Sequence, residues 1–281
     1  MKTTPESYRF LQDLVYRRSA IVIDESKEYL IESRLVPIAQ KEGLRSVEEL
    51  VQRMRSKPST VLVTHVVEAM TTNETSFFRD VHPFETLKNF LVPTLTKERA
   101  TTTRKLRIWC AAASTGQEPY SIAMLIREHF PLLAGWDVQI IATDINASVL
   151  ARAREATYRQ FEVNRGLPAT YLVKYFERVG TDWRLKPSIV DMVSFRELNL
   201  LETWPFHEKQ DIVFMRNVLI YFDVQTKRGI LSRVRQILAQ DGSLVLGGAE
   251  TTMNIDEQFR YERAGNTMVY QHRAPLVAVG T

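Results

Sequence analysis

The sequence has little cysteine and no long apolar run. Its single cysteine, Cys110, cannot form an internal disulfide, so nothing demands an oxidising compartment, and we expect it to be a small buried residue at a strand end. No apolar stretch reaches the roughly 18 residues that a membrane-spanning helix needs. The opening residues, MKTTPE, lack the apolar core of a secretory signal. We therefore expect a cytoplasmic protein without a membrane-inserted segment.

Clustered histidines and a strong excess of one charge are also missing. The five histidines are scattered at positions 65, 82, 129, 207 and 272, so no metal centre is predicted. The formal net charge is only +4, and the first 80 residues hold 12 basic and 12 acidic residues. That balance argues against a nucleic-acid-binding arm. The mild positive charge would favour acidic partners through long-range attraction.

The first 75 residues have the apolar spacing of helices and no alternation of strands with helices. The predicted helices cover residues 8–15, 26–42, 46–54 and 61–70. Pro37 is expected to bend or interrupt the second helix. Ser46 followed by Glu49 matches a capping box at the start of the third. The fourth is rich in β-branched residues, so a strand remains the alternative there.

From about residue 106 the pattern changes to short apolar strands alternating with helices. The predicted strands are 106–112, 138–144, 193–198, 211–215 and 243–247, and the predicted helices are 118–130, 147–156 and 224–239. This alternation favours a mostly parallel sheet covered on both faces. Residues 267–271 would add an antiparallel strand at one edge. Residues 157–199 are aromatic and break the alternation, so we expect them to form a small insertion.

The first of these strands runs into a loop of small residues. The loop, AAASTGQEP at 111–119, has only Gly116 and lacks the G-x-G-x-x-G that cradles a pyrophosphate. A nucleoside cofactor without phosphate, such as S-adenosylmethionine, would suit it better. Asp144 ends the next strand, 28 residues after Gly116, where a carboxylate can accept hydrogen bonds from both ribose hydroxyls. Alternatively, Asp144 is the N-cap of the helix after Asn146, and the loop an ordinary strand–turn–helix connection.

The strand at 211–215 also ends in residues that suit a site. Arg216, Asn217 and Tyr221 would lie at the rim of the same cleft, because the carboxyl ends of parallel strands share one edge of the sheet. Alternatively, Tyr221 is a core aromatic and Arg216 a surface charge. The Asn-Pro-Pro-Tyr sequence of many amine-methylating enzymes is absent, which counts against amino groups of DNA bases as substrate.

Four segments together resemble the chemoreceptor methyltransferases of the CheR family. They are NETSFFR (73–79), AASTGQEPYS (112–121), ATDI (142–145) and RNVLIYFD (216–223), in the family's order and with compatible spacing over nearly the whole chain. By composition alone, the first is no more than a capped linker. The resemblance implies a helical N-terminal domain (1–75) before a Rossmann-like methyltransferase domain of the α/β class (76–281). A small antiparallel β subdomain would be inserted at about 157–198.

The resemblance also implies a cofactor and the residues that hold it. The cofactor would be S-adenosylmethionine, with S-adenosylhomocysteine as product. The residues placed around it are Asn73, Thr75, Arg79, Glu118, Asp144, Asn199, Leu200, Arg216 and Asn217. Arg79 and Tyr221 match the family positions nearest the reacting methyl group and would be catalytic. The implied substrate is a glutamate side chain of a methyl-accepting chemotaxis receptor, which becomes a γ-glutamyl methyl ester.

The receptor would be an acidic coiled coil. Lys27, Arg34 and Lys41 lie at intervals of seven, which places them on one helical face if Pro37 only bends the helix. The corresponding helix of the family is basic and is thought to meet the receptor. Only Arg34 falls on one of the family's basic positions, so a merely solvated face is the alternative.

Two further expectations concern partners. Some members of the family that this sequence resembles grip a pentapeptide at the receptor tail, and those tend to have a longer, glycine-bearing loop at the position of the compact segment 179–185. The resemblance therefore implies an enzyme that does not depend on this pentapeptide, and we expect a monomer. Rival readings are a methyltransferase of another substrate such as RNA, supported only by the sequence pI of about 9.1, and a cofactor-binding signalling protein without turnover. The presence of both Arg79 and Tyr221 argues against the second rival.

Overall fold

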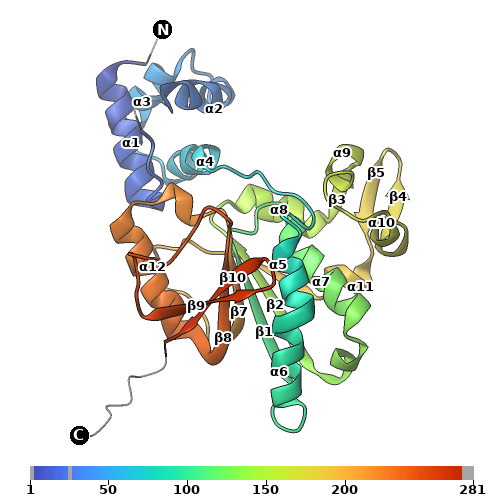
Figure 1. The fold of residues 1–281 in the computed structure, drawn as a ribbon. Coiled ribbons are helices and arrows are strands. Elements are labelled where there is room, and N and C mark those ends of the chain that lie inside the picture. Colours follow the sequence, from blue (N-terminus) through green and yellow to red (C-terminus); the bar gives the residue numbers. More distant parts are fainter. Residues whose placement is uncertain (1–2, 25–26, 274–281) are drawn as a thin grey trace, which may run out of the picture.

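The N-terminal part of the chain is all helical. The computed structural model describes residues 3–24 and 27–273 (Figure 1). Its first helices are α1 (Pro5–Ser19), α2 (Glu28–Lys41), α3 (Val47–Ser56) and α4 (Thr60–Met70). They enclose a core of their own, in which Leu11, Val15 and Leu35 are fully buried. The predicted helical domain is therefore confirmed, including the fourth helix, for which a strand was the alternative.

Two local expectations in this region are met only in part. Pro37 lies inside α2 and does not end it, while the predicted helix start at residue 26 lies outside the described residues. The Ser46 hydroxyl accepts the Glu49 N–H at 3.3 Å, as a cap should. The Glu49 carboxylate accepts the N–H of Arg45 at 2.8 Å instead of that of Ser46. Only half of the predicted capping box therefore forms.

A seven-stranded sheet forms the centre of the rest. Its order is β6 (Val193–Glu197), β2 (Asp137–Asp144), β1 (Lys105–Ala111), β7 (Gln210–Met215), β8 (Leu238–Leu246), β10 (Thr267–His272) and β9 (Phe259–Ala264). Only β10 runs against the others, which confirms the mostly parallel sheet. Placing the strand at 267–271 on the edge was wrong, because β9 lies outside it. Four of the six β9 side chains are exposed, so that strand shows no apolar alternation.

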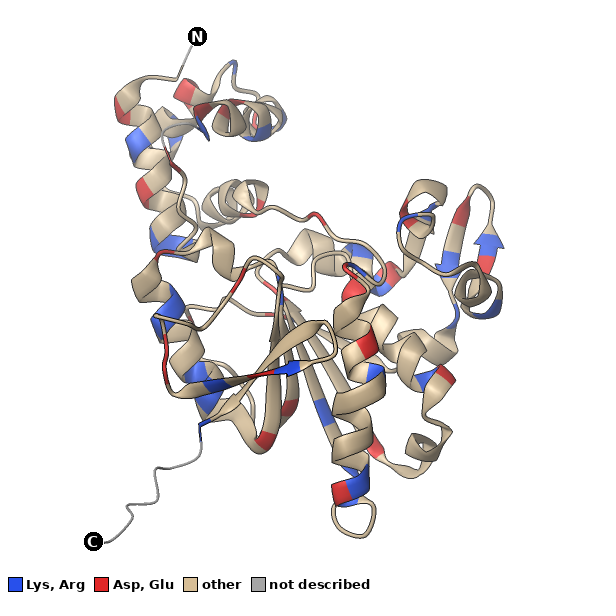
Figure 2. Ribbon diagram, viewed as in Figure 1, with Lys and Arg blue, Asp and Glu red and all other residues tan. Residues whose placement is uncertain are grey.

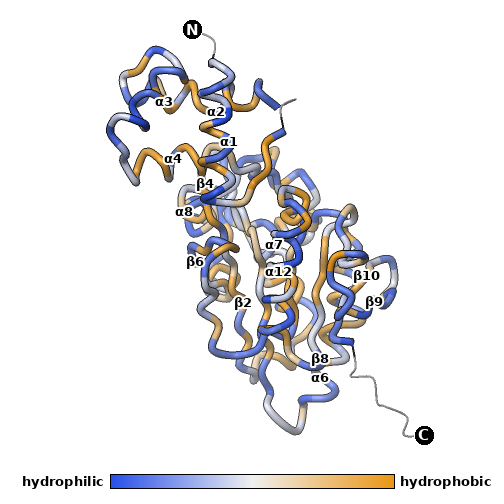
Figure 3. Tube along the Cα trace, turned by 90° about the vertical axis from the view of Figure 1, so that its left-hand side faces the viewer, coloured by the Kyte–Doolittle hydropathy of each residue, from blue (hydrophilic) through white to orange (hydrophobic). Residues whose placement is uncertain are grey.

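Helices cover both faces of this sheet. They include α7 (Gln117–His129), α8 (Ala147–Glu155), α12 (Val224–Ile237) and a continuous run of α5 (His82–Thr86), η2 (Leu87–Leu91) and α6 (Val92–Arg99). Figure 3 shows hydrophobic stretches along the enclosed strands. Cys110 in β1 is fully buried, as expected of a small apolar side chain. Within the described part of the chain, no helix is both long and apolar enough to cross a membrane.

The aromatic insertion forms a small separate sheet. Its antiparallel strands lie in the order β3 (Thr157–Arg159), β5 (Asp182–Leu185) and β4 (Phe176–Val179), with the short helices α9 (Gln160–Val163), α10 (Ala169–Tyr175) and α11 (Pro187–Val190). The Tyr158 ring packs edge-on against that of Phe77 at 5.0 Å, and its hydroxyl donates to the Thr115 carbonyl at 2.8 Å. The insertion thereby supports the loop that follows β1.

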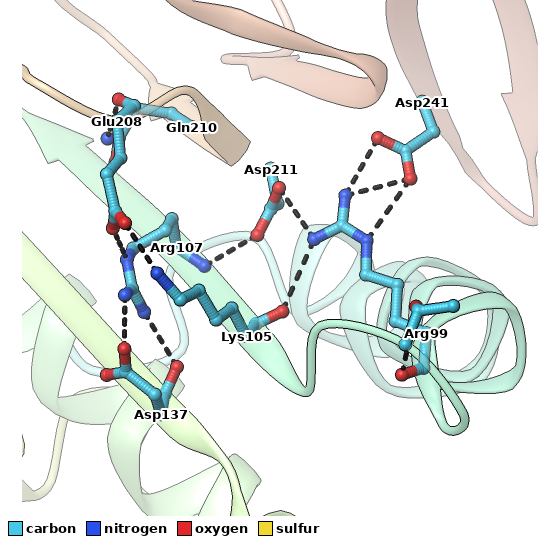
Figure 4. Close-up of polar contacts among 9 residues, drawn as sticks. Arg99, Lys105, Arg107, Asp137, Glu208, Gln210, Asp211 and Asp241 are labelled. Atoms are coloured by element: carbon cyan, nitrogen blue, oxygen red, sulfur yellow. Dashed lines mark hydrogen bonds and ion pairs between the residues drawn. The ribbon is translucent and has the colours of Figure 1, made fainter.

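Ion pairs connect the first residues of several strands, at the end of the sheet opposite the carboxyl ends of its parallel strands. The residues involved are Arg99, Lys105, Arg107, Asp137, Glu208, Asp211 and Asp241 (Figure 4). Arg107 in β1 is buried and binds Glu208 at 2.5 Å. The Asp211 carboxylate accepts the Arg107 N–H at 2.7 Å. These contacts stabilise the scaffold without reaching the carboxyl ends of the strands.

This network predicts a pH-dependent contribution to stability. Hydrogen bonds from Lys105 and Arg107 lower the pKa of Glu208 from 4.5 to about 2. A lowered carboxyl pKa stabilises the fold fully above the unfolded-state pKa, and this contribution is lost as the pH falls through the folded-state pKa. We expect Glu208→Gln to melt below the wild type at pH 7, with the difference shrinking from pH 4.5 towards pH 2. Thermal unfolding followed by circular dichroism tests this, and a difference independent of pH would contradict it.

Candidate active site

The cleft lies where the strand order of the sheet reverses. The chain continues from β1 to β2 on one side and returns to β7 on the other, and ligands of open α/β sheets bind beyond the carboxyl ends at such a point. The cleft there has an empty volume of about 920 Å³, solvent at its mouth included. All ten predicted site residues line it: Asn73, Thr75, Arg79, Glu118, Asp144, Asn199, Leu200, Arg216, Asn217 and Tyr221.

The loop after β1 has a left-handed backbone at three positions. Ala112, Ser114 and Gly116 have φ angles of 56°, 51° and 92°. A Cβ atom at Gly116 would lie 3.1 Å from Ala153 and from the Tyr120 ring, so glycine is required at this N-cap of α7. Small side chains elsewhere in the loop leave its backbone open to a ligand.

Asp144 is held at the end of β2 by backbone groups. One carboxylate oxygen accepts the Ser114 N–H at 2.8 Å and the other the Asn146 N–H at 2.9 Å. Burial raises the pKa of Asp144, and these two hydrogen bonds oppose the shift. The N-cap of α8 is Asn146, which accepts from Ser148 and Val149, so the alternative role for Asp144 was wrong. Each Asp144 oxygen keeps a lone pair for another donor.

Arg216 is enclosed, contrary to the surface alternative. Its side chain is 1% exposed and donates to Glu118 and Asp80, both at 2.7 Å, and to the Arg79 carbonyl at 2.9 Å. The guanidinium also lies over the Phe84 ring, 5.7 Å from its centroid. Burial raises the pKa of Glu118, and the positive charge of Arg216 opposes that shift. Arg216 therefore joins β7, α7 and the 73–80 linker at the cleft wall.

Arg79 and Tyr221 have few hydrogen-bond partners among the described residues. Both are half-buried and line the cleft. One Arg79 nitrogen donates to the Glu74 carbonyl at 3.0 Å, which leaves its other donors available. In the described residues the Tyr221 hydroxyl forms no hydrogen bond. Tyr221 is thus a cleft residue, not the enclosed core aromatic of the alternative.

The N-terminal domain supplies one wall of the cleft. The Val22 N–H donates to the Tyr221 carbonyl at 2.9 Å, and the Asn199 side-chain amide donates to the Arg18 carbonyl at 2.7 Å. Ser19, at the end of α1, also lines the cleft. The site therefore depends on contact between the two domains.

The structure gives Arg34 a contact that the sequence did not predict. Its guanidinium donates to the carbonyl oxygens of Met70 and Thr71 at 2.8 and 3.1 Å. It is therefore turned towards the linker that leads to the cleft, and its part in receptor docking stays a prediction. Lys27 and Lys41, the other two members of the predicted basic face, are exposed.

One residue of the site region was missed by the sequence analysis. The Glu250 carboxylate accepts five backbone N–H groups at 2.7–3.3 Å, from Asn217, Val218, Leu219, Ile220 and Gly247. It belongs to a loop after β8 with no periodic pattern and no recognised motif. Only its position after the glycine pair 247–248 signals an unusual backbone there.

The geometry of the cleft is that of a Rossmann-like protein, and comparison with known protein families shows which family this is. An acid ends β2, and a loop of small residues replaces a pyrophosphate-binding one, as in Rossmann-like proteins that bind a nucleoside cofactor without phosphate. Residues 73–268 match the family described as "CheR methyltransferase, SAM binding domain", and residues 6–71 match "CheR methyltransferase, all-alpha domain". The chain belongs to the CheR methyltransferase family. The predicted family and its cofactor, S-adenosylmethionine, are confirmed.

Curated relatives are similar over most of their length. "Chemotaxis protein methyltransferase Cher2" of Pseudomonas putida is 40% identical, covering 89% of this chain and 92% of the relative. "Chemotaxis protein methyltransferase 1" of Pseudomonas aeruginosa is 39% identical, covering 96% and 99%. "Chemotaxis protein methyltransferase" of Escherichia coli is 33% identical, covering 90% and 86%.

Arg34 gives a direct test of the linker's role. Arg34→Ala removes the donors that hold the 70–71 carbonyls, so the following Asn73 and Thr75 lose their fixed position. We expect the affinity for S-adenosylhomocysteine to fall about 5-fold, the equivalent of about 1 kcal/mol. Isothermal titration calorimetry measures this, with Lys41→Ala on the same helix as the control. If both variants bind like the wild type, Arg34 does not support the cleft.

Proposed function

We propose that this protein methylates glutamate side chains in the cytoplasmic coiled-coil region of bacterial chemoreceptors. The products would be γ-glutamyl methyl esters and S-adenosylhomocysteine. The observation that carries the proposal is the pairing of Arg79 and Tyr221 at one cleft of a CheR-family chain, each with donors to spare. The names of the relatives, chemotaxis protein methyltransferases, support a receptor substrate.

The residues of the cleft suit the cofactor. When bound, S-adenosylmethionine supplies a methyl group activated by a sulfonium sulfur. Asp144 would accept hydrogen bonds from the ribose hydroxyls with its remaining lone pairs. The buried Glu118 would contact the ammonium group of the cofactor's amino acid end, while Arg216 holds the Glu118 carboxylate in place. The linker residues Asn73 and Thr75 would close over the cofactor.

The proposed chemistry needs alignment and no general base. A glutamate with a pKa near about 4.3 is already ionised at neutral pH. The ionised carboxylate would be the nucleophile toward the methyl group that the bound cofactor supplies, and no side chain of the cleft would have to take a proton. Arg79 would hold the carboxylate by charge-assisted hydrogen bonds, and the Tyr221 hydroxyl would donate to another lone pair. Strong binding would weaken the nucleophile, so Arg79 positions it more than it activates it.

The insertion supports independence from a receptor-tail pentapeptide. Strands β4 and β5 are joined by only Gly180 and Thr181, and Val179 pairs directly with Asp182. Figure 2 shows residues of both charge signs along the strands of this hairpin. Two exposed basic residues remain for receptor docking on α2. They are Lys41, the last residue of the helix, and Lys27, which directly precedes it. We propose a monomer that binds no nucleic acid.

The function is tested by methyl transfer to receptor-containing membranes. Tritiated S-adenosylmethionine should give label that base releases as methanol, which is diagnostic of carboxyl methyl esters. Arg79→Ala should lower the rate by about 100-fold, as expected when a reacting group is misplaced by about 1 Å. Tyr221→Phe should cost about 10-fold, near one lost hydrogen bond to a charged group.

The control for these variants lies on β9. Tyr261 is an exposed tyrosine on that edge strand, and Tyr261→Phe should leave the rate unchanged. Absence of base-labile label on every receptor tested, despite binding of S-adenosylhomocysteine, would overturn the receptor assignment. Label of equal size with Arg79→Ala would overturn the catalytic role.

A further inference from the structure

Glu250 is a buried carboxylate whose partners are almost all backbone N–H groups. The residue is 8% exposed. One oxygen accepts from Asn217 at 2.7 Å and Gly247 at 2.8 Å, and the other from Val218 and Leu219 at 2.9 and 2.7 Å. Among residues 3–24 and 27–273, no lysine or arginine forms an ion pair with it. Its charge is therefore balanced by backbone dipoles, as in an anion-binding nest.

Four of the five N–H groups that Glu250 accepts belong to the 217–221 turn, which carries Asn217 and Tyr221 of the cleft. Asn217 has a left-handed backbone, with a φ of 58°, and is followed by the 3₁₀ turn η4 (Leu219–Tyr221). The first N–H groups of such a turn have no partner within it. Glu250 satisfies them from a different loop, so the path of the chain from Asn217 to Tyr221 is set by this side chain.

The loop that carries Glu250 is built around this contact. A Cβ atom at Gly247 would lie 2.7 Å from the Glu250 carboxylate and 3.0 Å from the Asn217 nitrogen. Only glycine allows the end of β8 to approach the 217–221 turn this closely. The Val22 N–H then binds the Tyr221 carbonyl from the other side. The turn is held between the β8 loop and the N-terminal domain.

We propose that Glu250 is the positioning residue of the active site, and that it acts through Asn217 and Tyr221. It does not line the cleft, whereas the two residues that it positions do. The inference about the turn stands on the hydrogen bonds alone. Its consequence for methyl transfer rests on the proposed function.

The chemistry of the pocket demands a carboxylate. A carboxylate has about four acceptor lone pairs and no donor. A glutamine would keep one oxygen and direct two N–H donors at backbone N–H groups, leaving several of them without acceptors. An aspartate keeps the charge but is one methylene shorter, so it would satisfy only part of the turn. We therefore expect the order of activity to be wild type, then Glu250→Asp, then Glu250→Gln.

A double-mutant cycle with Tyr221→Phe separates positioning from general destabilisation. In the methyl-transfer assay, Glu250→Gln should lower kcat by about 100-fold, the loss expected for a misplacement of about 1 Å. In the Tyr221→Phe background the same change should cost only about 10-fold, because the part of its effect that passes through the Tyr221 hydroxyl is already lost and the part that passes through Asn217 remains. An equal loss in both backgrounds would overturn the proposal.

A second readout does not depend on the proposed function. With 3-fluorotyrosine placed at position 221, Glu250→Gln and Glu250→Asp should each shift and broaden the ¹⁹F signal and weaken S-adenosylhomocysteine binding. Asp211→Asn is the control, because this buried carboxylate accepts the Arg107 N–H at the far end of the sheet. Asp211→Asn should lower the Tm and leave both the ¹⁹F signal and the affinity for S-adenosylhomocysteine unchanged. A Glu250→Asp spectrum and affinity identical to the wild type, or identical changes in Asp211→Asn, would refute the proposal even if no receptor is methylated.

Discussion

A positive charge buried at the end of β7 organises the cleft. Removing an ion from water costs several kcal/mol even after relaxation, so Arg216 is tolerated only where anions surround it. Those anions are Glu118 on α7 and Asp80 after the linker, and the Arg79 carbonyl adds a third acceptor. Three segments that are distant in sequence are thereby fixed around one guanidinium. Loss of both carboxylates would leave a buried charge unpaired, at a cost of about 3–5 kcal/mol.

Three buried carboxylates of the site region differ in which groups they bind, and the difference separates their roles. Glu118 is neutralised by Arg216, so its remaining oxygen can face a cation without adding an uncompensated charge. Asp144 accepts one backbone N–H on each oxygen and keeps capacity for two hydroxyls. Glu250 receives five N–H groups and has little capacity left for a ligand. The first two therefore suit ligand binding, and the third suits holding the protein chain.

The sequence predicted what local periodicity and topology determine. Alternating strands and helices place the carboxyl ends of β1, β2 and β7 at one edge, and this alone brings Asp144 and Arg216 together. The resemblance to the family named ten of the residues that line the cleft. The sequence did not predict β9, whose mostly exposed side chains carry no apolar signal. Nor did it predict the partners of Arg34 and Glu250, because a side chain that binds distant backbone groups leaves no local pattern.

The two domains are distinct along the sequence, but hydrogen bonds connect them around the cleft. Besides the contacts of Val22 and Arg18, the Glu68 carboxylate on α4 accepts the Ala147 N–H at the start of α8, 2.8 Å away. The N-terminal domain thus caps helix α8, which begins three residues after Asp144 in the sequence. A cofactor enclosed by both domains binds best when they are in contact, and by linkage its binding must stabilise that contact. The helical domain is therefore part of the candidate cofactor site.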